Sequence, residues 1–582
     1  MKNDKKEPMN PESLELMELI REPKIAYFSM EIGIQSSIPT YSGGLGVLAG
    51  DTIKSGADLN LPMVAVTLLS KKGYFRQELD AKGRQTEHPV NWDPAKHMTR
   101  LLHKVSVEIE GRKVYIQAWH YTVKSFTGGT VPVFFLDTDV AENSPEDREI
   151  TFFLYGNDLS YRLKQEVVLG LGGVRMLKKL GFEIKKYHLN EGHASLLTLE
   201  LLLHFRKPIE EVWDEKLVWD VNRVKELCLF TTHTPVEAGH DRFSYELVRR
   251  IMGEPIPFEV LKGLAGTEAL NMTLLALNLS EFVNGVAKKH GEVSRNMFPG
   301  YKISAITNGV HSYTWTCESF RRLYDKYLPG WANEPELFVR IGRIPDQEIW
   351  EAHQEAKTIL INHVRETTGV EMSPDLLTFG FARRATAYKR ADLLFSDLER
   401  LKAIGTGKIQ IIYAGKAHPN DLPGKALIER IFTFKETLKD AIKMVYLPNY
   451  DMELALKMVS GVDVWLNTPL RPREASGTSG MKAAHNGVMN FSVLDGWWIE
   501  GHIEGYTGWS IGPSPTESKL VDGFDTQDAE DLYRKLEQVI IPNFYSDRLI
   551  WTRMMQNAIG KNAYYFNTHR MMRRYVTEAY IR

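Results

Sequence analysis

Cysteine is almost absent from this chain of 582 residues, which contains only Cys228 and Cys317. Both lie among apolar or aromatic neighbours in the sequence. Two cysteines are too few for a disulfide framework, so the sequence excludes the small disulfide-stabilised secreted folds and fits a reducing compartment. We therefore expect a cytoplasmic protein.

Long apolar runs are absent too. Nowhere do eighteen apolar residues follow one another, and residues 1–11 are polar and charged, without the apolar core of a signal peptide. The sequence therefore predicts neither a membrane span nor an export signal.

An excess of charge of either sign is also missing. Lys and Arg number 72 and Asp and Glu number 74, which gives a formal net charge of −2. A chain with this balance creates no overall field that would attract nucleic acid or an anionic membrane, so we expect neither as a partner. With 43% hydrophobic and 25% charged residues the composition is that of a globular protein, and the length indicates two to four domains.

What the chain does contain is a regular alternation of apolar strand-like segments with helical patterns. Predicted buried strands are 24–30, 61–69, 185–189, 227–232, 281–283 and 302–306 in the first half, and 376–381, 409–414, 444–447, 462–466 and 488–493 in the second. Such alternation is typical of parallel sheets covered by helices, with ligands bound at the carboxyl ends of the strands. Predicted helices include 13–21, 158–180, 392–404, 424–439, 452–460 and an amphipathic final helix capped by Asn567.

Residues 474–487 combine several features of an anion site. They read Glu-Ala-Ser-Gly-Thr-Ser-Gly-Met-Lys-Ala-Ala-His-Asn-Gly and follow a predicted buried strand. A loop of small residues leaves backbone N–H groups free, and the helix expected to begin near Ser479 adds a positive end. Lys482 lies one turn into that helix, where its side chain leans back toward the loop. A phosphate group is the expected ligand, although a lysine considered alone would usually be a solvated surface residue.

Other glycine-rich, basic and polar segments follow predicted strands. Residues 42–46 form a glycine turn that opens a helix, and residues 383–390 carry four cations within eight positions. Taken singly, such a turn can serve tight packing and such a cluster can be a solvated basic face. Polar residues at 190–193, 232–237 and 307–311 can equally be helix caps or turns. No metal site is expected, because His233 and His240 do not have the spacing of a zinc motif.

Three strings, at 42–46, 381–390 and 474–487, resemble segments of the glycogen and α-glucan phosphorylases, and the resemblance extends from about Lys24 to the end of the chain. It implies an α/β fold of the glycosyltransferase-B type: two doubly wound Rossmann-like lobes that face a cleft, with a C-terminal helix crossing back to the first lobe. The expected divisions are a lead-in at 1–23, a glucan-side lobe at 24–311, connecting helices at 312–374, a cofactor-side and phosphate-side lobe at 375–560, and the crossover helix at 561–582.

The resemblance also implies an activity, the phosphorolysis of α-1,4-glucans by inorganic phosphate, with release of α-glucose 1-phosphate and retention of configuration. In that family a lysine anchors pyridoxal 5′-phosphate as a Schiff base, and the cofactor phosphate does the acid–base work. The catalytic positions carried over are Lys482, Arg384 and Lys389. The cofactor positions are Lys482, Gly43, Gly44, Thr478 and Lys389, and the substrate positions are His233, Asn308, Glu474, Ser476, Gly477 and Arg384. A homo-oligomer is expected by analogy.

Two other functions remain open at this point. A retaining glycosyltransferase of the glycogen-synthase type would share the fold but use a nucleotide sugar and have no need of Lys482. An inactive glucan-binding protein would need few of the charged positions. The chain also departs from the best-known phosphorylases at Trp497-Trp498, where they have Ala-Asn, and aromatic bulk there could reshape the acceptor channel or a gate.

Overall fold

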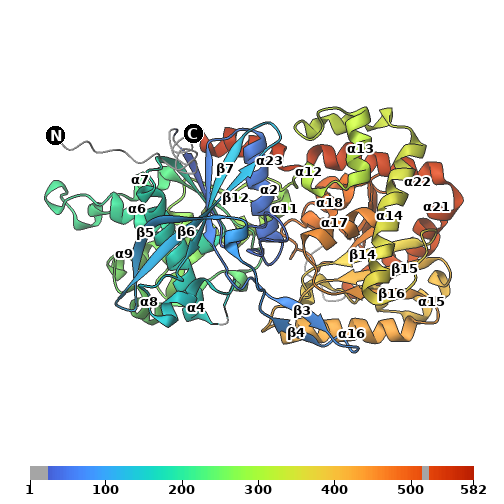
Figure 1. The fold of residues 1–582 in the computed structure, drawn as a ribbon, viewed down its shortest axis with the longest axis horizontal. Helices are drawn as coiled ribbons and strands as arrows, with labels where there is room; N and C mark the ends of the chain where they lie inside the picture. The colour runs from blue at the N-terminus through green and yellow to red at the C-terminus, as the bar shows by residue number, and fades with distance from the viewer. Residues whose placement is uncertain (1–21, 23, 157, 514–523, 582) are drawn as a thin grey trace.

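The computed structural model describes residues 22, 24–156, 158–513 and 524–581, so the helix predicted at 13–21 lies outside the described residues. Two large sheets, one of nine strands and one of six, lie side by side along the long axis of the molecule (Figure 1). Helices cover both sheets, which confirms the mixed α/β class predicted from the alternating pattern.

The nine-stranded sheet is formed by the first half of the chain. From one edge to the other its strands are β13 (Ser304–Ala305), β12 (Phe282–Gly285), β9 (Cys228–Thr231), β8 (Ile184–Asn190), β1 (Lys24–Phe28), β2 (Met63–Leu68), β7 (Thr130–Asp137), β6 (Arg112–Lys124) and β5 (Thr99–Ile109). The strands from β13 to β7 are parallel, and β6 and β5 continue antiparallel. Alternate residues of β1 pack into hydrophobic clusters on opposite faces, which is why this strand is apolar throughout.

The six-stranded sheet is formed by the second half and is parallel throughout. Its strands, in spatial order, are β16 (Lys443–Leu447), β15 (Ile409–Ala414), β14 (Leu377–Ala382), β17 (Val464–Asn467), β18 (Met489–Val493) and β19 (Gly508–Ile511). Five of the six were predicted. The sixth, β19, was missed because its Gly-Trp-Ser-Ile sequence is short and only half apolar.

The helices also follow the predictions in most places. Those of the second half are α14 (Asp346–Thr368), α15 (Leu398–Gly405), α16 (Leu422–Leu438), α17 (Met452–Gly461) and α18 (Thr478–His485). The helix predicted at 392–404 begins later than expected, because Asp397 accepts a hydrogen bond from the Arg400 N–H and caps α15. The helix predicted at 158–180 is α4 (Leu159–Val167) and α5 (Gly173–Lys179), joined by a π-helical turn.

Two segments connect the sheets and pair with each other. Residues 307–311 lead out of the nine-stranded sheet and residues 565–568 lead back, with the Val310 N–H bonded to Phe566 O (3.2 Å) and the Thr568 N–H bonded to Val310 O (3.0 Å). Asn567 caps α23 (Thr568–Tyr575), as predicted. This helix lies against the first sheet, where the Tyr575 hydroxyl is 3.1 Å from Thr231 Oγ1.

A hairpin of β3 (Arg76–Leu79) and β4 (Gln85–His88) reaches from the first half onto the second (Figure 1). Gln77 Nε2 donates to Gly415 O (2.9 Å), and the Asn449 N–H donates to Gln77 Oε1 (3.0 Å). The sequence did not predict this contact, since both partners of Gln77 are more than 300 residues away.

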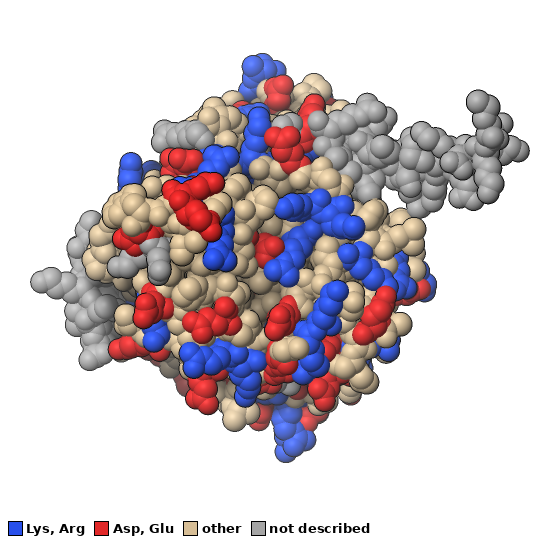
Figure 2. Space-filling view, turned by 90° about the vertical axis from the view of Figure 1, so that its left-hand side faces the viewer, with Lys and Arg blue, Asp and Glu red and all other residues tan. Residues whose placement is uncertain are grey.

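The surface carries mixed charge. Figure 2 shows acidic and basic side chains interspersed over one end of the molecule, in line with the balanced composition. None of the helices in the described part of the chain combines the length and the apolar character that crossing a bilayer requires.

Candidate active site

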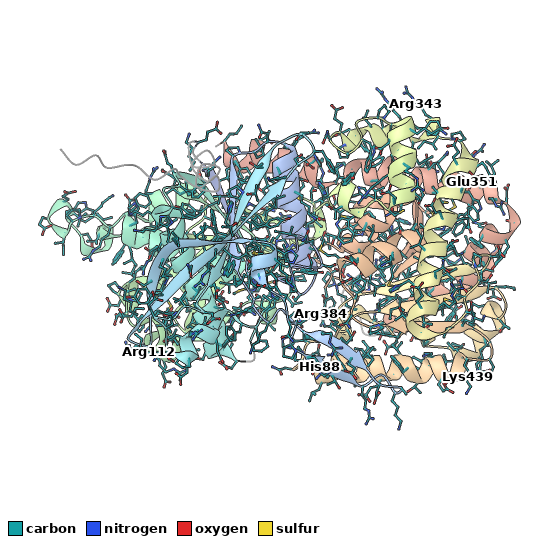
Figure 3. The ribbon with its side chains drawn as sticks, in the orientation of Figure 1. His88, Arg112, Arg343, Glu351, Arg384 and Lys439 are labelled. Atoms are coloured by element: carbon teal, nitrogen blue, oxygen red, sulfur yellow. The ribbon has the colours of Figure 1, made fainter. Side chains whose placement is uncertain are left out.

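A cavity of about 540 Å³ lies at the carboxyl ends of strands from both sheets. All eleven residues that the sequence analysis selected line it: Gly43, Gly44, His233, Asn308, Arg384, Lys389, Glu474, Ser476, Gly477, Thr478 and Lys482. Figure 3 shows Arg384 between the two halves of the molecule, next to the β3–β4 hairpin. The structure therefore brings the predicted positions together in one place, as expected for parallel sheets.

The loop before α18 has the geometry that its glycines suggest. Gly477 has φ of 87°, a left-handed conformation that glycine adopts without strain, and the helix begins at the next residue. The Ser476 hydroxyl is buried and finds no hydrogen-bond partner among the described residues. Behind the loop, the Trp497 N–H donates to Ser476 O (2.8 Å) and fixes the loop in place. The free N-terminus of α18 and an unpaired hydroxyl thus face the cavity together.

A second helix, α2 (Gly44–Asp58), also begins at the cavity. A side chain added at Gly43 or Gly44 would meet no atom within 4 Å, so the cavity is open above this turn. The N–H groups of Ser42 and Gly43 donate to Glu31 Oε2 (2.5 and 3.2 Å). The turn therefore already binds one carboxylate of this chain, which is what a helix N-terminus favours. Glu31 was not among the predicted site residues.

Lys482 is buried in the wall of the cavity, with 7% of its surface exposed. Its Nζ lies 3.9 Å from the centre of the Trp315 ring, and no ion pair of Lys482 is found among the described residues. Burial lowers the pKa of Lys482 to about 8. About a tenth of the amine is therefore unprotonated at pH 7, far more than for an ordinary lysine, and a nucleophilic lysine must be unprotonated.

Glu474 is held by two cations. Its Oε2 lies 2.7 Å from Arg383 Nη2 and 2.6 Å from Lys389 Nζ. Burial alone would raise the pKa of Glu474, but Arg383 and Lys389 outweigh it and lower the pKa to about 2. Arg383 Nη1 is buried and has no hydrogen-bond partner among the described residues. An anion that entered here would share both cations with Glu474.

Neutral hydrogen-bonding groups line the side of the cavity formed by the first sheet. His233 Nε2 is 2.7 Å from Asn190 Oδ1, and burial lowers the pKa of His233 to about 3, so its imidazole is uncharged at neutral pH. The Asn308 side-chain oxygen is buried without a partner among the described residues, while its backbone oxygen accepts from Arg570 Nη2 (3.0 Å). Such groups suit a neutral polyhydroxyl ligand.

Several further residues line the cavity that the sequence analysis left without a role: Glu31, Tyr155, Arg162, Trp315, Arg383 and Lys416. The Arg162 guanidinium lies 4.5 Å from the Tyr155 ring centre and donates to Asp241 Oδ2 (2.9 Å). Lys416 donates to Phe75 O (3.0 Å), and burial lowers its pKa to about 8. Arg383 belongs to the basic segment 383–390 that the sequence analysis singled out, but only the fold shows that Arg383 contacts Glu474.

Trp497 and Trp498 lie outside the lining of the cavity. They are 2% and 0% exposed, and neither lines the cavity. Trp497 packs instead against Gly480, where an added Cβ would lie 2.7 Å from the indole, and against Phe566, with ring centres 4.8 Å apart. Trp497 therefore supports the 474–480 loop from behind.

Asp495 anchors the same loop, and its buried position makes the stability of the folded chain depend on pH. Burial raises the pKa of Asp495 to about 7, and the negative charge of Glu474 adds to this effect. The backbone N–H groups of Glu474 and Gly496 donate hydrogen bonds to the Asp495 carboxylate and act in the opposite direction. The folded chain therefore binds more protons than the unfolded chain between about pH 4 and 7, so stability falls as the pH rises through this range.

Asp495→Asn removes this titration. We expect the difference in unfolding free energy between wild type and Asp495→Asn to decrease by a few kcal/mol, on the order of one per pH unit, from pH 4 to pH 8. Urea unfolding of both proteins across this range measures the difference. A difference that stays constant with pH would show that Asp495 keeps an ordinary carboxyl pKa.

The cavity thus combines two kinds of binding group. Four cationic side chains, those of Arg383, Arg384, Lys389 and Lys482, and the N-termini of α2 and α18 suit phosphate groups. The cavity also offers neutral donors and acceptors, among them His233, Asn308 and Ser476. No group of three or more His, Cys, Asp or Glu side chains in the described part of the chain is arranged to hold a metal ion.

Comparison with known proteins identifies the family. The carbohydrate phosphorylase family model matches residues 258–504. The maltodextrin phosphorylase of Thermococcus litoralis is 40% identical over 96% of this chain and 70% of its own length. The chain belongs to the carbohydrate phosphorylase family.

Other members of the family align over the same extent. The glycogen phosphorylase of Aquifex aeolicus is 37% identical over 96% of this chain and 86% of its own length, and that of Mycobacterium tuberculosis is 36% identical over 96% and 70%. The match therefore covers both sheets and the cavity between them.

Proposed function

We propose that this member of the family is a pyridoxal-phosphate-dependent α-glucan phosphorylase. It would use inorganic phosphate to release α-glucose 1-phosphate from the non-reducing end of an α-1,4-glucan, with retention of configuration. The observation that carries the proposal is the position of Lys482, a buried amine with a pKa of about 8 that lies one turn into α18. It shares one cavity with Arg383, Arg384 and Lys389.

The proposed architecture is the glycosyltransferase-B arrangement. A first lobe at 24–311 would bind the glucan, and a second at 375–560 would bind the cofactor and phosphate. Residues 312–374 would connect the lobes, and the helix within 561–582 would cross back to the first. The pairing of the two crossing segments next to the cavity supports this division.

The chain's own residues fit pyridoxal phosphate. Lys482 would anchor it, while Gly43, Gly44, Thr478 and Lys389 would surround its phosphate, with the open space above the glycine turn as room for the group. When bound, the group supplies a phosphate that exchanges a proton with the substrate phosphate. Arg384 would hold that substrate phosphate close by. The unpaired Arg383 Nη1 provides a further donor for an anion in this place.

The sugar would lie against the neutral side of the cavity. His233, Asn308, Ser476 and Gly477 would bind its hydroxyls, and the unpaired oxygens of Asn308 and Ser476 support this assignment. Glu474 would exchange part of its ion pair with Arg383 and Lys389 for a sugar hydroxyl when phosphate arrives.

The proposal extends to setting and assembly. The glucan and inorganic phosphate are the proposed partners, and a homo-oligomer is proposed by analogy alone. Cys228 and Cys317 are both buried and free, which supports a reducing, cytoplasmic setting.

A direct assay tests the activity. The chain is incubated with maltoheptaose and inorganic phosphate, with pyridoxal phosphate supplied or withheld, and α-glucose 1-phosphate is measured. Release that requires both phosphate and the cofactor is expected. Glucosyl transfer from a nucleotide sugar without the cofactor would point instead to the glycogen-synthase type, and glucan binding with neither reaction to an inactive binding protein.

A further inference from the structure

A buried carboxylate lies close behind the cofactor lysine. Asp51, on α2, is 1% exposed, and its Oδ2 accepts hydrogen bonds from Trp315 Nε1 (2.8 Å) and from the His311 N–H (3.2 Å). Its other oxygen, Oδ1, is buried and has no partner among the described residues. A buried carboxylate oxygen without a donor is costly, so its presence calls for a functional reason.

The indole of Trp315 connects this carboxylate to Lys482. The N–H of the ring is bonded to Asp51, and the ring itself lies 3.9 Å from Lys482 Nζ. One rigid side chain therefore fixes the carboxylate and the lysine relative to each other. Hydrogen bonding alone does not explain the negative charge, because an asparagine oxygen would accept the same two N–H groups.

We propose that Asp51 is the buried counter-charge of Lys482, held in place by Trp315, and that it determines how much positive charge the lysine nitrogen keeps in this site. The inference rests on the proposed function, in which Lys482 carries the cofactor. Asp51 touches neither cofactor nor substrate in this proposal and is a positioning residue that acts through its charge and through Trp315.

The other charged groups around Lys482 either are paired with other residues or lower the pKa of Lys482, whereas Asp51 raises it. Lys54, one turn further along α2, lies 3.3 Å from Thr314 Oγ1 and lowers the pKa of Lys482, whereas Asp51 raises it; both effects are smaller than that of burial. Asp58 is paired with His311 Nε2 (2.7 Å) and lies 3.2 Å from His569.

The two histidines close to Asp51 and Lys482, His311 and His485, carry little charge of their own. Burial lowers the pKa of His311 and lowers that of His485 to about 4. His485 Nε2 is bonded to the Ser312 hydroxyl (3.0 Å). The charges that act on Lys482 from behind are therefore those of Asp51 and Lys54, with opposite signs.

Because Asp51 and Lys54 act on Lys482 in opposite directions, replacing each of them should shift the same measured midpoint in opposite directions. The full-length protein loaded with pyridoxal phosphate is titrated with base, and the loss of the visible absorbance of the protonated cofactor–lysine linkage is followed. We expect Asp51→Asn to lower the midpoint by about 1 pH unit and Lys54→Met to raise it by less. Asp58→Asn, a buried carboxylate on the same helix, is the matched control and is expected to leave the midpoint unchanged.

The outcomes separate the inference from a structural role. Asp51→Glu restores the charge and is expected to return the midpoint toward that of the wild type. An unchanged midpoint in Asp51→Asn, or a shift of the same sign in Asp51→Asn and Lys54→Met, would overturn the inference. If Asp51→Asn does not fold, Trp315→Phe replaces it, because it removes the N–H that holds Asp51; a midpoint equal to that of wild type would again overturn the inference.

The proposed function is checked separately in the same samples. Reduction with borohydride fixes the cofactor to the wild-type chain wherever it is attached. Absence of any label on Lys482 in the wild type would contradict the proposed function itself. A label on Lys482 in all variants with identical midpoints would leave the proposed function in place and reject only the role of Asp51.

Discussion

Lys482→Ala is expected to lose both bound pyridoxal phosphate and phosphorolytic activity. The side chain is the anchor of the cofactor in the proposed site, and its burial one turn into α18 leaves no other amine in the same position. We expect kcat/KM for glucan phosphorolysis to fall by at least about a thousandfold, or about 4 kcal/mol of transition-state stabilisation. Cofactor content after gel filtration and α-glucose 1-phosphate release measure the two losses.

Lys416→Ala is the matched control for this variant. Lys416 lines the same cavity and also has a pKa lowered to about 8 by burial, but it lies at the end of β15 and donates to Phe75 O. It is expected to retain the cofactor after gel filtration. Retention by Lys482→Ala and loss by Lys416→Ala would reverse the assignment of the anchoring lysine.

Arg384→Ala is expected to retain the cofactor and to raise the KM for inorganic phosphate. Arg384 is an exposed guanidinium at the cavity, separate from the Arg383–Glu474–Lys389 ion pairs, so its removal leaves those contacts intact. Loss of one charged hydrogen-bonding group from a phosphate site costs about 1.5–3 kcal/mol, which corresponds to a roughly 10- to 100-fold increase in KM. Initial rates against phosphate concentration measure it.

Arg343→Ala provides the comparison for Arg384→Ala, because Arg343 is exposed and lies far from the cavity (Figure 3). Its KM for phosphate is expected to equal that of the wild type. Loss of the cofactor from Arg384→Ala, or an unchanged KM for phosphate, would reject the separation of a cofactor phosphate site from a substrate phosphate site.

The parts of the fold that local sequence determines were predictable. Apolar β-branched runs predicted eleven of the fifteen strands in the two large sheets, and Asn567 was correctly expected to cap the last helix. The strand, loop and helix around Lys482 were predictable for the same reason, since glycine and small residues between a buried strand and a helix leave few alternatives.

What the sequence could not predict depends on contacts between distant segments. Arg383 meets Glu474 only because β14 and β17 are neighbours in the sheet, and Gln77 meets Gly415 only because the β3–β4 hairpin crosses between the two halves. The burial of Trp497 under the loop was missed because an aromatic residue after a strand is compatible with either a channel wall or a core. The Asp51–Trp315 contact joins residues 264 positions apart and has no local signal.

Borohydride reduction of the loaded wild-type protein, followed by mass spectrometry of its peptides, tests the central claim most directly. The account predicts a reduced pyridoxyl phosphate group on the peptide that contains Lys482 and nowhere else. A label on Lys416, a half-buried lysine of the same cavity whose pKa is also lowered to about 8, or no label in a protein that still releases α-glucose 1-phosphate, would contradict it.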